Sequence, residues 1–264
     1  MMSTMNPETF IISMSVSLLV GMILVYEVGR QIGRAQIRRN PKGLARGIGA
    51  AEGSVFGLLG LLIAFTFSGA AARLEERRAL ITEEANDIGT AFLRLDLLAE
   101  DDKAELRERF RKYAELRSTP PKIDSLSVAD GWYITTGEMQ RAIWTRALAA
   151  SQRDEADPDA TKLLLPALNE MIDITSTRKR ATKDHPPIAI YMLLAALSLL
   201  GALMIGYAAA DNDKRNWLHP IAFAVITALA VHLILDLEFP RVGMIRVDAS
   251  DAAILDARKD MNEP

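Results

Sequence analysis

Four apolar windows contain most of the hydrophobic side chains of the chain, and charged stretches separate them. The windows cover residues 10–26, 54–72, 187–210 and 217–235. Each is close to the length of about 20 residues that an α-helix needs to cross about 30 Å of hydrocarbon. The pattern therefore predicts an all-α, polytopic membrane protein with four transmembrane helices.

A long polar segment, residues 73–186, separates the second and third windows and is rich in helix-forming residues. Prolines and turn-like sequences divide it into three expected helices, over residues 73–118, 136–152 and 160–183. We therefore expect three domains. These are residues 1–72, transmembrane helices one and two with a basic connecting loop; the helical extramembrane insert, residues 73–186; and residues 187–264, transmembrane helices three and four with a C-terminal tail.

The first expected helix of the insert has an apolar seam along one face. Hydrophobic residues recur at intervals of seven, and two more lie four positions after members of that series: Leu74, Ile81, Ile88, Leu95, Ala85 and Phe92. This spacing favours packing against another helix. Because no break separates this helix from the second window, we expect the second span to continue out of the membrane as one long helix.

Three acidic residues on this helix, Glu83, Glu84 and Asp87, have no basic residue three or four positions away. A basic sequence that leads back to the third span contains Arg178 and Arg180. At about 1.5 Å per residue, Glu83 lies about 17 Å beyond the second span and Arg178 about 14 Å before the third. We expect Arg178 to pair with Glu83 or Asp87. Arg180 is a second candidate partner, and a solvated charged face is the alternative.

Two sequence motifs lie beside the second and fourth windows. The stretch "FGLLGLLIAFTFSGA" leads towards "TEEANDIGTAFLRLDLL" (residues 82–98), and "LDLEFPRVGMIRVDASD" (residues 235–251) follows the last window. These stretches resemble the bestrophin-like domain-of-unknown-function family of bacterial membrane proteins. The residues that match the motifs of the family are Glu84, Ala85, Asn86, Arg94, Asp236, Pro240 and Gly243. The order Phe239–Pro240 departs from the proline–phenylalanine order that is frequent in the family.

The resemblance implies a distant likeness to bestrophins, which are oligomeric anion channels. In such a pore the second span lines the ion pathway, and apolar rings form a neck that gates by dewetting. The candidate pore-lining residues along one face of the second span are Phe56, Gly60, Ile63 and Phe67. Alternatively, these aromatic residues face lipid and the glycines pack against other spans. The resemblance also adds Arg94 to a candidate charge clasp: Glu83, Glu84, Asp87, Arg94, Arg178 and Arg180.

A histidine and a carboxylate form a candidate polar pair within the membrane. Asp236 lies four residues after His232, and so on the same face of the fourth span. Such a pair can relay a proton or bind a cation. Alternatively, Asp236 orients the histidine or docks the tail. No further ligand accompanies the pair, so the sequence assigns no metal site.

Composition and missing motifs narrow the function further. A net charge of -3 gives no reason to expect a nucleic acid or an acidic substrate as a partner. The chain has no cysteine, three separated histidines and no glycine-rich phosphate loop, so we assign neither catalytic residues nor a cofactor and expect no enzyme. Two functions remain: a bestrophin-like ion channel, or a non-transporting membrane scaffold or sensor that binds a partner through its insert. The expected partners are the lipid bilayer, further copies of the chain and an inorganic ion.

Basic residues near the spans bear on the orientation of the chain. Six follow the first span and none precedes it: Arg30, Arg34, Arg38, Arg39, Lys42 and Arg46. Lys214 and Arg215 raise this side to eight, against nine beside the spans on the other side. Charges that belong to a long insert weigh less. We therefore expect a multi-pass protein of the inner membrane with both termini and the insert on the non-cytoplasmic side, whereas the bestrophin resemblance implies the opposite.

Overall fold

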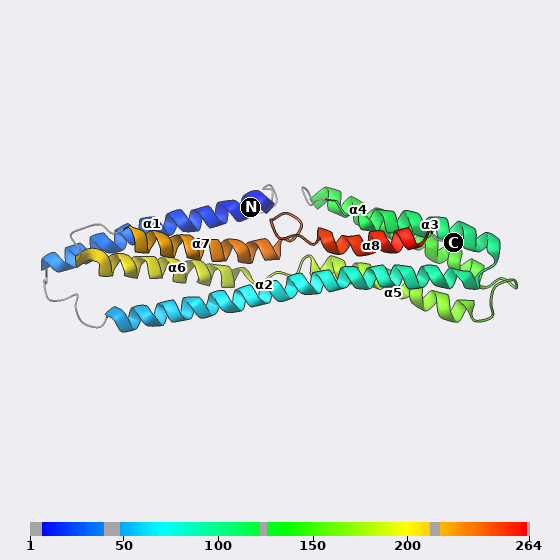
Figure 1. The fold of residues 1–264 in the computed structure, drawn as a ribbon, viewed down its shortest axis with the longest axis horizontal. Coiled ribbons are helices and arrows are strands. Elements are labelled where there is room, and N and C mark those ends of the chain that lie inside the picture. The colour runs from blue at the N-terminus through cyan, green and yellow to red at the C-terminus, as the bar shows by residue number, and fades with distance from the viewer. Residues whose placement is uncertain (1–6, 40–47, 122–125, 212–216, 263–264) are drawn as a thin grey trace. The chain divides into compact units, whose positions relative to one another are not determined.

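A computed structural model describes residues 7–39, 48–121, 126–211 and 217–262, and all regular elements in these ranges are helical (Figure 1). The α-helices are α1 (Pro7–Arg39), α2 (Ile48–Leu93), α3 (Glu100–Ser118), α4 (Leu126–Ser151), α5 (Ala160–Ala181), α6 (Ile188–Ala208), α7 (Leu218–Glu238) and α8 (Asp248–Asp260). Two short 3₁₀ helices are η1 (Arg94–Leu97) and η2 (Ala209–Asp211). In the described part of the chain, α1, α2, α6 and α7 are long and apolar enough to cross a membrane. The expected all-α class is confirmed.

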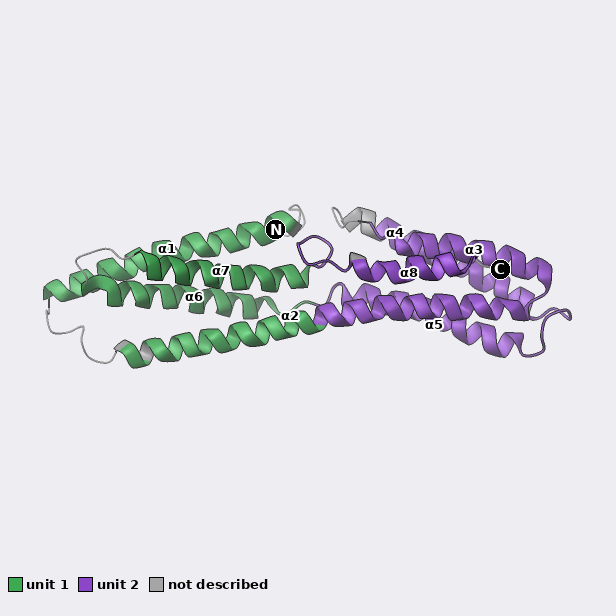
Figure 2. Cartoon of the chain, in the orientation of Figure 1, with its two compact units in different colours: residues 1–72, 185–239 green, residues 73–184, 240–264 purple. Residues whose placement is uncertain are grey.

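The contacts divide the chain into two compact units (Figure 2). The first unit consists of residues 1–72 and 185–239, and the second of residues 73–184 and 240–264. The apolar helices belong to the first unit, and the polar insert belongs to the second. The C-terminal tail, which the sequence placed with the last two spans, has its contacts with the insert.

A close approach of α1 to α6 forms the centre of the first unit. A Cβ atom at Gly29 would overlap the main-chain carbonyl of Leu203, and one at Gly206 would overlap that of Tyr26. Only glycine allows two helix backbones to come this close, as in other membrane helix pairs. The buried cluster at this crossing contains Met22, Tyr26, Ala202 and Ala224.

The second unit is a helical bundle formed by the outer part of α2 with α3, α4, α5 and α8. The predicted apolar seam is confirmed, because all six of its residues are buried, five on α2 and the last on η1: Leu74, Ile81, Ala85, Ile88, Phe92 and Leu95. Phe92 meets Phe110 of α3 edge to face, with ring centroids 6.1 Å apart. As expected, α2 is one unbroken helix of 46 residues that leaves its apolar segment and enters this bundle. Its length is about 69 Å at 1.5 Å per residue.

The expected helix over residues 73–118 is two helices. α2 ends at Leu93, and Leu98 and Ala99 are extended, with ψ angles of 160° and 148°, before α3 begins at Glu100. Neither proline nor glycine marks this break. The available signal is the acidic first turn of α3, because negative side chains stabilise the positive end of a helix.

Three other boundaries differ from the expectation. α4 begins at Leu126 rather than 136, because Asp130–Gly131 is accommodated inside the helix. α1 extends to Arg39, so several basic residues assigned to the connecting loop are helical. α8 (Asp248–Asp260) was not predicted in the C-terminal tail. Lys42, Arg46, Lys214 and Arg215 lie outside the described residues.

Candidate functional site

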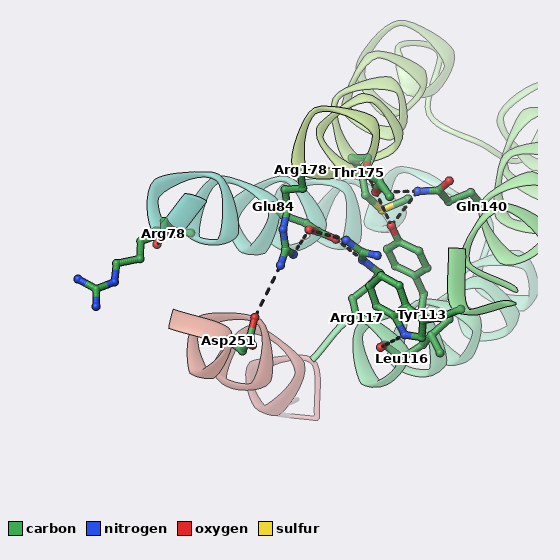
Figure 3. Close-up of polar contacts among 12 residues, drawn as sticks. Arg78, Glu84, Tyr113, Leu116, Arg117, Gln140, Thr175, Arg178 and Asp251 are labelled. Atoms are coloured by element: carbon green, nitrogen blue, oxygen red, sulfur yellow. Dashed lines mark hydrogen bonds and ion pairs between the residues drawn. The ribbon is translucent and has the colours of Figure 1, made fainter. Parts of the chain in front are cut away.

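A buried carboxylate lies at the centre of the second unit, between two arginines (Figure 3). Glu84 of α2 is fully buried. Arg117 of α3 donates from Nη2 to Glu84 Oε2 at 2.9 Å and from Nε to Oε1, while Arg178 of α5 donates from Nη1 to Oε2. One side chain therefore ties three helices together, and we call these residues the Glu84 clasp.

The Glu84 clasp continues into the C-terminal helix. Arg178 Nη2 lies 3.6 Å from Asp251 Oδ1 of α8, and Asp251 pairs with Arg241 at 3.0 Å. Arg178 thus bridges two carboxylates that lie far apart in the sequence (Figure 3). These ion pairs explain why the tail belongs to the second unit.

The electrostatics of the Glu84 clasp favour the ionised carboxylate. Burial alone would raise the pKa of Glu84, but hydrogen bonds and charge from Arg117 and Arg178 outweigh it and hold the pKa below its usual value. Arg117 also lies over the ring of Trp132, 4.2 Å from its centroid. Removing one member of such a cluster leaves a buried charge without its partner, which costs about 3 to 5 kcal/mol.

A neutral polar cluster lies beside the Glu84 clasp and connects α3, α4 and α5. Gln140 Nε2 donates to Tyr113 Oη and to Thr175 Oγ1, both at 2.9 Å. Tyr113 Oη and Thr175 Oγ1 lie 3.3 Å apart (Figure 3). Because these groups are buried and satisfy one another, they fix the register of the three helices.

The structure selects a different acid from the one expected for Arg178. The sequence paired Arg178 with Glu83 or Asp87, whereas its partners are Glu84 and Asp251. Glu83 is exposed because it points away from the seam, and Asp87 is only partly buried. Burial, followed by the charges of Glu83, Glu170 and Glu84, raises the pKa of Asp87 to about 6.

The remaining arginines of the candidate charge clasp lie elsewhere. Arg180 is exposed. Arg94 donates from Nη1 to the carbonyl oxygen of Leu163 at 2.6 Å, so it joins η1 to α5 and does not bind Glu84.

Arg117 is the member of the clasp that the sequence interpretation missed. A signal was present, because the buried stripe of α3 runs through Leu106, Phe110 and Tyr113 and reaches Arg117 at the same helical spacing. A basic residue in line with a buried stripe needs an acidic partner on a facing helix.

In the first unit, the histidine of the expected polar pair contacts a different helix. His232 Nδ1 lies 3.1 Å from Ser15 Oγ of α1, rather than bonding to Asp236. Asp236 is itself buried. His185 Nδ1 lies 3.2 Å from Glu238 Oε2, and its ring lies against Phe239. Among the described residues, no three histidine or carboxylate side chains are grouped as metal ligands.

The four candidate pore-lining residues of α2 have different surroundings. Phe56 contacts Phe223 of α7 edge to face, with centroids 5.4 Å apart, and therefore points into its own bundle. Ile63 is partly buried. Gly60 and Phe67 lie on the exposed side of the helix, and within the described structure no atom approaches a Cβ built at Gly60 within 4 Å. A pore-lining role is therefore compatible with Gly60 and Phe67, and the contact of Phe56 argues against one there.

The chain is similar to known proteins over nearly its whole length. It matches the Bestrophin-like domain over residues 10–252. Solved structures of variants of a bacterial bestrophin homologue from Klebsiella pneumoniae share 14–15% identity with it and give TM-scores of 0.69 and 0.71; they cover 92–94% of this chain, which covers 98–99% of theirs. None of the curated proteins compared with the chain matches it.

At this identity the solved structures show a shared fold. The four apolar helices, the helical insert and the match over residues 10–252 agree with one another. This chain belongs to the bestrophin-like family.

Proposed function

We propose that the protein is an oligomeric ion channel in which the exposed face of the apolar part of α2 lines the pathway. The main support is that the apolar segment of α2 is little covered within one protomer. Only 11% of this segment is buried, against 22–39% for the apolar segments of α1, α6 and α7. A second copy or an aqueous pathway can cover this face. The bacterial bestrophin homologues support the proposal through their fold.

Small residues on this face favour close assembly around a narrow pathway. Gly53, Gly57 and Gly60 recur on the exposed side of α2, and in the described structure a Cβ at any of them meets open space. Phe67 lies about two turns beyond Gly60 and is 46% exposed. Glycine permits close helix approach, and an aromatic ring in a narrow neck can gate ions by excluding water.

The Glu84 clasp positions the helix that lines the proposed pathway. By binding Glu84, Arg117 and Arg178 hold the outer part of α2 in place on α3 and α5. We propose that the clasp is structural: it fixes the helix that lines the pathway and does not itself carry ions. The burial of Glu84, Arg117 and Arg178 supports this role.

Ion flux through liposomes tests the channel. The purified wild type should pass ions along a KCl gradient, and Gly60→Leu should reduce the flux several-fold because its side chain projects into the pathway. Ala222→Leu is the matched control, since it enlarges an exposed small residue on another span, α7. Both variants must retain the mass of the wild-type assembly.

Two results would overturn the proposal. An oligomeric wild type with no flux under any gradient excludes conduction. Equal inhibition by Gly60→Leu and Ala222→Leu removes α2 from the pathway. The first result favours the alternative of a membrane scaffold or sensor.

We also propose that both termini and the second unit lie on the non-cytoplasmic side of the inner membrane. The support is the group of basic residues after the first span. Three of them, Arg34, Arg38 and Arg39, are exposed on α1. Arg30 is 1% exposed, so it contributes less to this signal than its position suggests.

A further inference from the structure

The second unit presents three acidic side chains on the face formed by α2 and α5: Glu83, Asp87 and Glu170. We call this group the acidic surface. None of the three makes an ion pair or hydrogen bond with another described residue, although Glu83 and Glu170 are close enough to affect Asp87. Partial burial raises the pKa of Asp87, and the charges of Glu83 and Glu170 raise it further. The described part of the chain therefore places no basic side chain against this surface.

The opposite face of the same bundle carries a groove of the opposite charge. It lies between α3 and α4 and consists of two adjoining hollows of about 490 and 480 Å³. Its charged lining contains four basic residues and two acidic ones: Arg109, Lys112, Arg141, Arg146, Glu105 and Glu108. Within the chain, Glu105 pairs with both Arg109 and Arg146, and Glu108 pairs with Lys112, so the lining keeps an excess of positive charge. We call it the basic groove. Arg141 is exposed and has no acidic partner among the described residues.

The two faces are on opposite sides because of the order of the helices around the bundle. α3 contacts α4, and α4 contacts α5. α2 is joined to α3 by the contact of Glu84 with Arg117 and to α5 by the contact of Glu84 with Arg178. The order is therefore α2, α3, α4, α5, and the groove between α3 and α4 lies across the bundle from the face of α2 and α5.

The Glu84 clasp sets the level of the acidic surface along the bundle. Arg178 contacts Glu84 on a helix that runs antiparallel to α2. The residue three positions beyond Glu84 on α2 and the residue three positions before Arg178 on α5, both counted away from the membrane segment, therefore lie at the same level. These residues are Thr175 and Asp87.

The polar cluster extends this register to the basic groove. Gln140 bonds to Thr175, so its neighbour Arg141 lies at about the level of Asp87. Gln140 also bonds to Tyr113, which brings α3 into the same register. The acid and the arginine without an acidic partner are therefore at matching heights.

A second acid and base also match in height. Glu170 is five residues beyond Thr175 on α5, about 7.5 Å further from the membrane segment. Arg109 is four residues beyond Tyr113 on α3, about 6 Å further in the same direction. The difference of about 1.5 Å is small compared with the reach of either side chain.

We propose that the acidic surface of one copy docks against the basic groove of the next copy, head to tail, so that the second units close a ring. The proposal rests on the assembly that the proposed channel requires. Copies inserted in a membrane in one orientation are related by rotation about its normal, which produces no shift along that axis. Only groups of equal height can then meet, and Asp87 with Arg141 and Glu170 with Arg109 satisfy this condition.

Cross-linking of the full-length protein tests the contact, because the chain has no cysteine of its own. The double variant Glu170→Cys/Arg109→Cys, treated in detergent with a short bis-maleimide, should give a ladder of covalent multimers up to the complete ring. Glu170→Cys alone should give no dimer, since like surfaces do not meet in a head-to-tail contact. Glu170→Cys/Asp256→Cys, with its second thiol exposed on α8, is the matched control and should give none.

Charge reversal provides an independent measurement. Asp87→Lys and Arg141→Glu should each raise the protein concentration at which half of the protein is assembled by about tenfold, as measured by light scattering. The double variant should restore assembly, because each new charge meets its opposite. Rescue by the pair separates a contact between copies from misfolding of one variant.

The contact is overturned by cross-linking of Glu170→Cys alone, by unchanged assembly of both charge variants, or by a wild type that remains monomeric. Flux of the wild type in liposomes is measured separately. A cross-linked ring without flux overturns the proposed channel and leaves the contact standing. Flux through a protein whose double cysteine variant yields no ladder overturns the contact alone.

Discussion

At the scale of single residues, the position of Glu84 determines which of three neighbouring acids is buried. Glu84 lies three residues after Ile81 and four before Ile88, inside the apolar seam, whereas Glu83 points away from it. The sequence showed that these acids lacked local partners. It could not show that Arg117 would return to the same point, because that depends on the turn between α2 and α3.

Replacing Glu84 tests whether the clasp stabilises the fold. Glu84→Gln should lower stability at pH 7.5 by about 3 to 5 kcal/mol, because two buried guanidinium groups lose their counter-charge. The folded-state pKa of Glu84 is depressed, so its contribution is present above pH 4.5 and is lost as pH falls through the folded-state value. Melting of the variant and the wild type should therefore converge in acid.

Glu155→Gln is the control for this measurement, because Glu155 is an exposed acid in the turn between α4 and α5. It should melt with the wild type at neutral pH. A Glu84→Gln protein that melts at the wild-type temperature at pH 7.5 would show that the clasp contributes no stability.

At the scale of elements, the sequence predicted helices well where an apolar period identified them and less well where helices begin or end. The four spans and the seam of α2 follow directly from hydrophobic spacing. The break at Leu98 carries no glycine or proline. α8 is a short helix that buries Ile254 and pairs its Asp251 with Arg178 of α5. Its partners come from distant parts of the chain, so local patterns do not reveal it.

The crossing of α1 and α6 gives a prediction at this scale. Gly206→Ala should lower the melting temperature markedly, because the added methyl group overlaps the carbonyl oxygen of Tyr26 and separates the two helices. Gly131→Ala is the control, since Gly131 is exposed on α4 and its Cβ meets no described atom within 4 Å. Equal melting of the two variants would show that the close approach is unnecessary.

At the scale of the whole molecule, the chain separates apolar and charged regions into two units that it enters and leaves more than once. α2 passes from residues 1–72 into the second unit, and the chain returns to the first at residue 185. The expected division into three consecutive domains could not anticipate the return of residues 240–264. That return depends on contacts with distant residues, such as Asp251 with Arg178 and Arg258 with Glu115, and not on composition.

The proposed orientation is tested by labelling from outside the cell. Glu155 is a suitable labelling site because it is exposed in the second unit. In the cysteine-free chain, Glu155→Cys should react with a membrane-impermeant maleimide once the outer membrane is permeabilised. Labelling only after the inner membrane is broken would place the insert in the cytoplasm, as the bestrophin resemblance implies.

The stacking of Arg117 on Trp132 has an optical consequence. A guanidinium 4.2 Å from the centre of an indole ring perturbs the electronic transitions of that ring. The chain contains two other tryptophans, Trp144 and Trp217. With those replaced by phenylalanine, the fluorescence of Trp132 becomes an intrinsic probe of whether Arg117 is in place, so the protein carries its own reporter at the junction of α2, α3 and α5.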